Sequence, residues 1–317
     1  MEDLAEDSKD TKVSTTISKM SMLLSGSFMG CVGLFVTFLG KYSIFTIVLL
    51  RGIFGTLFLT LFMIKSRSFS LEFLKESIKL HWKPLIISGL IYPFIIYLYF
   101  FTIIIYGYAI AAFLLYTNGI FVLIFIILSK MDNVSKITII SFILAIIGVA
   151  IIMEFWSSQA QVFSLGLITG LLSGLTLAIF VFFKKVIYNK RNNNQEILKT
   201  KGDFDIFLAW WHTLFLILIF LPLGFEDLPK LNLVDLIFAL LLGLIPTALA
   251  FVLHNVGVKN DKGGNILILA YFEPVVATIN TIIFLKIFSI YTIIGGACIL
   301  IANALVLKYS SESYYKR

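Results

Sequence analysis

The feature that most constrains this chain is a succession of ten apolar stretches. A transmembrane helix needs roughly 20 mainly apolar residues to cross a hydrocarbon core about 30 Å thick. Hydrophobic residues make up 59% of the 317 residues and charged residues 14%, whereas ordinary globular proteins are about 25% charged. This pattern predicts an all-α integral protein of the cell membrane. The expected spans are Met20–Leu39, Tyr42–Ile64, Pro84–Ile105, Ala109–Leu128, Ile137–Met153, Leu165–Phe183, Phe204–Leu223, Leu233–Val256, Ile266–Leu285 and Tyr291–Leu307.

Lysine and arginine follow a clear sidedness along these spans. Of the 25 Lys and Arg, one, Arg51, falls inside a span and three, Lys41, Lys230 and Lys286, fall in expected outside loops. The other 21 fall on the expected cytosolic side. Because basic residues in short loops favour the cytosol, we expect a multi-pass protein with both termini cytosolic. The net charge of +7 then reflects orientation and not nucleic-acid binding.

The segments outside the spans are short. Residues 1–19 begin with an acidic run that has few apolar side chains, which predicts a disordered cytosolic tail. Residues 20–153 and 164–307 each hold five spans, and 308–317 form a cytosolic C-terminal tail. No basic run or cleavage site precedes the first span, so we expect it to be retained and not removed as a signal peptide. The segment 70–80 fits an interfacial helix or a solvated linker helix equally well.

Three short matches recur in the same order in the two halves. Leu23–Gly26 resembles Leu171–Gly174, Gly89–Pro93 resembles Gly243–Pro246, and 135–140 resembles 289–294. Five spans in each half would make the second copy enter the membrane from the opposite side, so the matches predict a five-plus-five inverted-topology repeat. Two such halves can rock about a central site, which is typical of transporters. Gly-x-x-x-Gly patterns at Gly26–Gly30 and Gly166–Gly174 predict close helix packing.

Two charged residues lie near the middle of spans, where a charge costs roughly 2.5–3.5 kcal/mol. Arg51 is in the second span and Glu273 in the ninth, with Asn280 on the Glu273 face. Glu273 is either a proton acceptor or solute contact, because burial disfavours a charged carboxylate, or one member of a fixed ion pair with Arg51. The sequence leaves both interpretations open.

Interrupted helices are a second indication of a midplane site. Pro93 and Pro246 occupy corresponding spans, and Pro274 and Gly119 interrupt the ninth and fourth. Further polar and aromatic candidates for the cavity, each of which could equally serve ordinary helix packing, are Asn118, Tyr116, Tyr92, Tyr271, Trp211 and His212. His212 fits a proton relay or a satisfied donor between helices equally well.

No enzyme signature is present in the sequence. It contains no His-Glu-x-x-His, no Gly-rich phosphate loop and no cysteine cluster with metal-ligand spacing. The three histidines, His81, His212 and His254, are scattered, and Cys31 and Cys298 both fall in apolar spans. We therefore expect no enzyme, cofactor, metal or disulfide framework.

Several of these residues together resemble the drug/metabolite transporter superfamily, in particular its ten-helix EamA-like permeases. The resemblance covers Met20–Leu307 and is carried by Tyr271–Ala277, Ser289 with Ile294–Ala297, Arg51 between Leu50 and Gly52, and Gly243–Asn255. It implies a five-plus-five inverted repeat around a central cavity used for efflux or exchange of small metabolites.

The predicted function is a secondary transporter that exports small organic metabolites, such as amino acids or drug-like compounds, by alternating access with proton coupling. We expect a cavity lined mainly by the third, fourth, eighth and ninth spans, in a monomer or homodimer. The alternative is an obligate exchanger of phosphorylated or nucleotide-linked metabolites, suggested by buried Arg51. A third hypothesis, a scaffold whose partners bind the basic segment 184–201, conflicts with the midplane charges.

Overall fold

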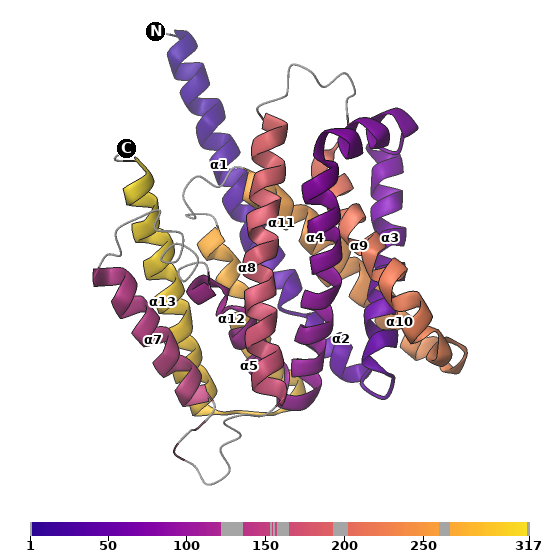
Figure 1. The fold of residues 1–317 in the computed structure, drawn as a ribbon, viewed down its shortest axis with the longest axis vertical. Helices are drawn as coiled ribbons and strands as arrows, with labels where there is room; N and C mark the ends of the chain where they lie inside the picture. Colours follow the sequence, from indigo (N-terminus) through magenta and orange to yellow (C-terminus); the bar gives the residue numbers. More distant parts are fainter. Residues whose placement is uncertain are drawn as a thin grey trace.

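The computed structural model describes residues 2–121, 136–152, 154, 156, 165–192, 202–259 and 267–315, which contain helices and no strand. The helices pack into one elongated bundle (Figure 1). In chain order they are α1 (Glu2–Met29), α2 (Val32–Phe38), α3 (Ile44–Lys65), α4 (Leu71–Tyr106), α5 (Tyr108–Leu115), α7 (Lys136–Ile152), α8 (Leu165–Asn192), α9 (Phe204–Gly224), η2 (Phe225–Lys230), α10 (Leu233–Gly243), η3 (Leu244–Leu249), α11 (Ala250–Lys259), η4 (Leu267–Tyr271), α12 (Phe272–Leu285) and α13 (Ile290–Tyr315).

Six helical stretches of the described chain are long and apolar enough to cross a membrane. They are Thr16–Phe38, Ile44–Lys65, Leu71–Tyr106, Leu165–Arg191, Phe204–Lys230 and Leu233–Lys259. Four shorter apolar helices, Tyr108–Phe121, Ile139–Ile152, Leu269–Leu285 and Ile290–Ala302, coincide with the other expected spans. The described residues thus form helices and no strand, as expected of a multi-pass membrane protein, while ten crossings and the inverted repeat stay predictions. The ends expected at Leu128, Met153 and Ile266, and most of the link at 154–163, lie outside the described residues.

Apolar and polar side chains are distributed as in a protein surrounded by lipid. On α7, Ile139, Ile143 and Ile147 are exposed, while Ser141 is buried. Buried polar residues elsewhere include Arg51, and every such group must find its partner within the bundle. Since a hydrocarbon surrounding does not penalise exposed isoleucine, this arrangement is stable in a membrane.

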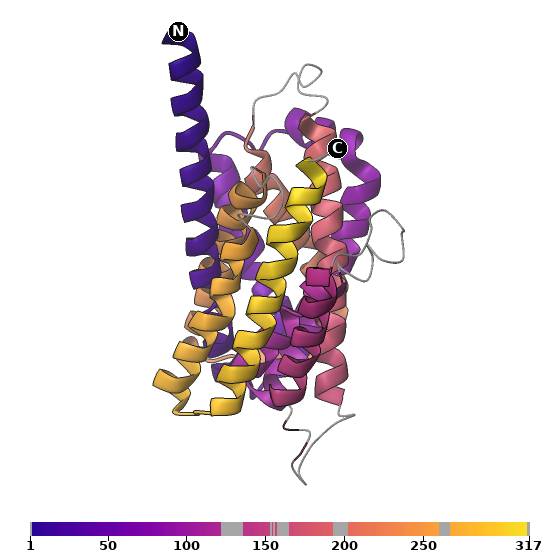
Figure 2. The ribbon, with the colours of Figure 1, turned by 90° about the vertical axis from the view of Figure 1, so that its left-hand side faces the viewer.

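Helices far apart in the sequence lie side by side. α1 packs along α11, α3 along α9, α4 along α8, α5 along α12, and α7 along α13. Figures 1 and 2 show α7 and α13 as a pair at one edge of the bundle, with α4 and α8 running together elsewhere.

Glycines allow close contacts between helices at several places in the bundle, as the Gly-x-x-x-Gly pattern predicts for two of them. A Cβ placed on Gly170 of α8 would lie 2.6 Å from a Leu114 methyl, and one on Gly30 would lie 2.5 Å from Val276 Cβ. At the contact of α7 with α13, a Cβ on Gly148 would lie 2.6 Å from the Gly295 carbonyl oxygen. The predicted close helix packing is therefore confirmed at Gly30 and Gly170, and Gly148 adds a close contact that was not predicted.

Both chain ends lie at the same end of the bundle (Figure 1). The structure differs there from the expected tails, because α1 begins at Glu2 and α13 continues to Tyr315. Acidic residues such as Glu2 and Asp3 suit the first turn of a helix, where the backbone dipole is positive. The N-terminal part of α1 continues the apolar span as one helix that projects beyond the bundle, seen at the top of Figure 2.

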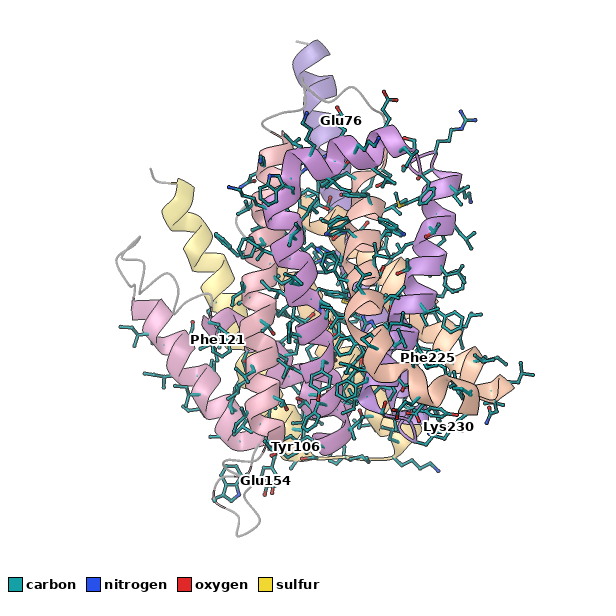
Figure 3. The ribbon with its side chains drawn as sticks, turned by 45° about the vertical axis from the view of Figure 1, so that its right-hand side comes forward. Glu76, Tyr106, Phe121, Glu154, Phe225 and Lys230 are labelled. Atoms are coloured by element: carbon teal, nitrogen blue, oxygen red, sulfur yellow. The ribbon has the colours of Figure 1, made fainter. Side chains whose placement is uncertain are left out.

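The helix α4 is too long to be only a membrane span. Its 36 residues extend about 54 Å at 1.5 Å per residue, against a hydrocarbon core of about 30 Å. Figure 3 shows its first part, around Glu76, lying across the end of the bundle before the helix turns into it. Phe73, Ser77 and His81 form the buried face of this part, while Leu71 is exposed. The segment is thus helical, as both interpretations of 70–80 required.

Candidate functional site

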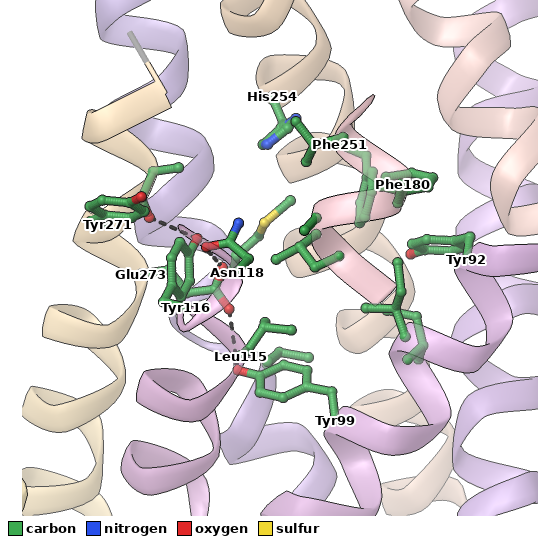
Figure 4. A pocket seen from close by; sticks show the side chains of 18 of the residues that line it. Tyr92, Tyr99, Leu115, Tyr116, Asn118, Phe180, Phe251, His254, Tyr271 and Glu273 are labelled. Atoms are coloured by element: carbon green, nitrogen blue, oxygen red, sulfur yellow. Dashed lines mark hydrogen bonds between the residues drawn. The ribbon is translucent and has the colours of Figure 1, made fainter. Parts of the chain in front are cut away.

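A cavity of about 240 Å³ lies between α4, α5, α8, α11 and the start of α12. Most of its wall is apolar or aromatic, and its charged and titratable lining is confined to a few side chains (Figure 4). Those side chains are Arg51, Lys185, His254 and Glu273, with the hydroxyls of Tyr92, Tyr99, Tyr116 and Tyr271 and the amide of Asn118. The expected third, fourth, eighth and ninth spans all contribute, and α8 adds a wall that the sequence did not single out.

Glu273 lies at one side of this cavity, in the first turn of α12. Its side chain is buried, and Tyr99 donates a hydrogen bond of 3.2 Å to Oε1. The Tyr116 hydroxyl lies 2.9 Å from Oε2 (Figure 4). The two tyrosines come from α4 and from the turn after α5, so three separate parts of the chain meet at this carboxyl group.

The Tyr116 hydroxyl has a second neighbour, the Ala270 carbonyl oxygen at 2.8 Å. A phenol has one proton and can donate it to only one of these two acceptors at a time. If it donates to Ala270, the contact with Glu273 is a hydrogen bond only when Glu273 itself carries a proton. If it donates to Glu273, the carboxylate can be ionised. The site therefore has two hydrogen-bonding arrangements that differ by one proton.

Arg51 does not pair with Glu273: among the described residues no ion pair within 4.0 Å involves either side chain. Instead, Nη2 donates to the Pro246 carbonyl at 3.2 Å. Its guanidinium lies 5.4 Å from the Phe100 ring centre and 5.9 Å from that of Phe251. The fixed ion pair considered from the sequence is therefore wrong, because the π-helical turn at Pro246 presents a carbonyl group that Arg51 reaches.

Three buried polar atoms in the cavity wall have no hydrogen-bond partner among the residues that the structure describes. They are Nε of Arg51, the hydroxyl of Tyr92 and Oδ1 of Asn118. Arg51 and Tyr92 are 3% and 1% exposed, so bulk water does not satisfy them. Buried polar atoms are normally hydrogen-bonded, and unsatisfied ones in a cavity indicate a place for a bound solute or water.

The wall contributed by α8 brings two lysines that the sequence placed in the loop after the sixth span. α8 continues to Asn192, so Lys184 is fully buried and Lys185 reaches the cavity. Lys184 Nζ lies within hydrogen-bond distance of His254 Nδ1, at 3.0 Å, and 5.4 Å from the Phe180 ring centre. The apolar residues Ile187 and Tyr188, which follow these lysines, were the sequence signal that the packed helix continues past them.

Other candidates lie away from the cavity lining. Asn280 donates to the Gly30 carbonyl at 2.7 Å, in the short interruption of the helix between α1 and α2. Trp211 donates to the Leu85 carbonyl at 2.9 Å, and His212 Nε2 lies 3.1 Å from the Ser88 hydroxyl. These contacts join neighbouring helices, and none of the three side chains lines the cavity, although the His212 ring packs against the lining residues Phe180 and Tyr92.

The proline and glycine residues that were expected to interrupt helices do not all lie at the points where the helices end. Pro93 lies inside α4 without ending it. Pro246 lies in a π-helical turn, whose i→i+5 hydrogen bonds widen the helix locally. Pro274 is in the first turn of α12, where a missing N–H costs nothing, so the break falls upstream, at η4. Gly119 follows a turn at residues 116–117.

Comparison with known proteins adds a family. Residues 164–308 match the model of the EamA-like transporter family. A solved structure titled "Crystal structure of protein" aligns with a TM-score of 0.60 over 93% of this chain and 96% of that chain, at 14% sequence identity. At this identity the likeness concerns the fold alone. A search of curated proteins finds no match.

Proposed function

We propose, from the premise that residues 164–308 belong to the EamA-like transporter family, that this protein exports small organic metabolites by alternating access. The family assigns a membrane transporter of the drug/metabolite transporter superfamily, not an enzyme. The cavity is the proposed solute site, and Glu273 is the proposed proton-coupling group.

The observation that carries the proposal is the carboxyl group of Glu273 in the cavity wall. It is 3% exposed and lies in an apolar bundle, where an ionised group with no counter-charge is costly. Two tyrosine hydroxyls stabilise the carboxylate without neutralising it. The neutral and ionised forms of such a group can be close in free energy, which proton coupling requires.

The shared proton of Tyr116 gives that coupling a structural consequence. When Glu273 is protonated, the Tyr116 hydroxyl donates its proton to the Ala270 carbonyl of η4. When Glu273 is ionised, its carboxylate competes with that carbonyl for the same proton. Loss of the Ala270 contact would loosen the short 3-10 turn that precedes α12. Protonation would thus bias the turn at which α12 begins.

Alternating access needs two similar halves, and the helix pairing is consistent with them. In span order, the side-by-side pairs are first with eighth, second with seventh, third with sixth, fourth with ninth and fifth with tenth. If each span is replaced by its counterpart in the other half, the pair of the first and eighth spans and the pair of the third and sixth spans are interchanged. The other three pairs are unchanged. A pairing pattern with this symmetry supports the proposed five-plus-five inverted repeat.

The size of the cavity bears on the solute. A volume of about 240 Å³ lies below the roughly 300–1,000 Å³ of pockets for drug-sized ligands. It favours small metabolites over nucleotide-linked ones in this conformation. Obligate exchange of small phosphorylated metabolites stays the second candidate, because Arg51 and Lys185 line the same cavity.

The test is flux in proteoliposomes containing the purified full chain. A panel of metabolites is offered with and without an imposed pH gradient, and wild type is compared with Glu273→Gln. Gln keeps one oxygen that accepts from one of the two tyrosines, and its NH2 group can donate to the other hydroxyl, but Gln cannot exchange a proton. We expect gradient-driven flux to fall at least about tenfold in the variant.

Glu72→Gln is the matched control, since Glu72 is exposed in the first turn of α4 and outside the cavity. It should leave flux unchanged. Flux that requires solute on the far side and is insensitive to both the gradient and Glu273→Gln would instead assign obligate exchange. Absence of flux for every solute would reject transport itself.

A further inference from the structure

The cavity has more positive than negative groups. Arg51, Lys185 and His254 line it, and the buried Lys184 lies directly behind His254, whereas Glu273 is the one acidic residue of the lining among the described residues. Neither Arg51 nor Lys184 has a carboxylate within 4.0 Å in the described part of the chain. A buried cation without a counter-charge is costly in a membrane.

The two cations lie beside one aromatic wall. The guanidinium of Arg51 is 5.9 Å from the Phe251 ring centre, and Lys184 Nζ is 5.4 Å from that of Phe180. Tyr92 packs between them, with ring centres 5.2 Å from Phe251 and 5.5 Å from Phe180. Cation–π contacts offset part of the cost of burying the two charges. They do not supply the missing negative charge.

The unsatisfied groups on this side of the cavity are hydrogen-bond donors. In the described part of the chain, neither Arg51 Nε–H nor the Tyr92 hydroxyl has a hydrogen-bond partner. When Lys184 is protonated it donates to Nδ1 of His254, and the Nε2 of His254 then carries the ring proton and is a donor as well. Figure 4 shows Tyr92 and His254 across the cavity from the cluster of Glu273 with Tyr116 and Tyr99. Donors and cations on one side suit an oxyanion.

We propose that this side of the cavity, lined by Arg51, Tyr92 and His254 with Lys184 behind His254, binds the oxyanion group of an organic anion. The apolar body of the anion lies against Phe180 and Phe251, which line the same cavity. The inference rests on the proposed function, since it names the class of solute for that site. A carboxylate and a phosphate share the required chemistry.

Binding of four probes with one aromatic body tests this assignment on the purified full-length wild-type protein. Phenylacetate and phenyl phosphate are anions, phenylacetamide is neutral, and phenethylamine is a cation. The readout is the rise in melting temperature with probe concentration. We expect one or both anions to stabilise the protein at concentrations at least about tenfold lower than the amide and the amine, because a hydrogen bond to a charged group contributes about that factor. The stronger anion identifies the oxyanion.

Two variants locate the site. Arg51→Gln and Lys184→Met should each weaken anion binding about tenfold or more, while Lys286→Met, a matched change at an exposed lysine, should not. The wild-type comparison decides the proposal even if a variant fails to fold. Equal or better binding of the amide or amine, no binding of either anion, or anion binding that survives both variants would overturn it.

Flux separates this inference from the proposed function. Anion-selective binding without flux of any solute would retain the anion site and reject transport. Flux without selectivity for anions would retain transport and reject the anion site.

Discussion

The hydroxyl of Tyr116 lies 2.9 Å from Oε2 of Glu273, and the same hydroxyl lies 2.8 Å from the Ala270 carbonyl. Tyr99, in contrast, reaches only the carboxyl group in this cluster, at 3.2 Å from Oε1. The two tyrosines are both buried and both line the cavity, but only Tyr116 connects the carboxyl group to the backbone of η4.

This difference predicts unequal effects of two identical substitutions. Tyr116→Phe should lower gradient-driven flux about tenfold, since it removes a hydrogen bond to a charged group and the link to η4. Tyr99→Phe should lower it less. Both are measured in proteoliposomes at equal protein density. Equal losses in the two variants would mean that the Ala270 contact has no part in coupling.

Asn280 should be a structural residue. Asn280→Ala leaves the Gly30 carbonyl without its donor at the break between α1 and α2, which should cost about 1–3 kcal/mol of stability. The melting temperature of the detergent-solubilised protein should fall, while the half-saturation concentration of a transported solute stays unchanged. A changed half-saturation concentration at normal stability would place Asn280 in the solute path.

Arg51 should stabilise the π-helical turn as well as line the cavity. Arg51→Leu removes the donor to the Pro246 carbonyl and should destabilise the protein by about 1–3 kcal/mol. Arg51→Gln keeps an amide donor of shorter reach and should be closer to wild type. The comparison uses thermal unfolding of both variants. Equal melting temperatures for Leu, Gln and wild type would contradict a structural role for this contact.

Gly33 should tolerate no side chain. A Cβ there would lie 1.8 Å from Cγ of Tyr108, whose ring is fully buried and whose hydroxyl donates to the Met29 carbonyl at 3.0 Å. Gly33→Ala should therefore cost about 3 kcal/mol or more through overpacking. Gly40→Ala, at an exposed position, is the control and should cost much less. The yield of monodisperse protein and its melting temperature provide the measurement.

The orientation predicted from basic residues can be checked by labelling. With Cys31 and Cys298 replaced by Ala, single cysteines are introduced at Lys230 and at Lys79, which are both exposed. In intact cells a membrane-impermeant maleimide should label Lys230→Cys and not Lys79→Cys. The reverse pattern would place both termini outside.

The amino-acid sequence by itself determined the class of this protein. Long apolar runs have one stable solution in a bilayer, because helices satisfy all of their backbone hydrogen bonds internally. A charge near the middle of a span is costly wherever the helix lies, so Arg51 and Glu273 were identifiable from position alone. The Gly-x-x-x-Gly spacing likewise predicted close helix contacts, because the absence of a side chain acts locally.

Only the tertiary structure decided which of these groups meet. Partners such as Arg51 and Pro246, or Glu273 and Tyr99, are separated by more than 170 residues, and no local pattern pairs them. Lys184 appeared to belong to a loop, because a lysine next to an apolar run normally ends a span. Its burial depends on His254 and Phe180, which a different set of helix contacts would have placed elsewhere. Packing chooses among chemically reasonable partners, and that choice is made in three dimensions.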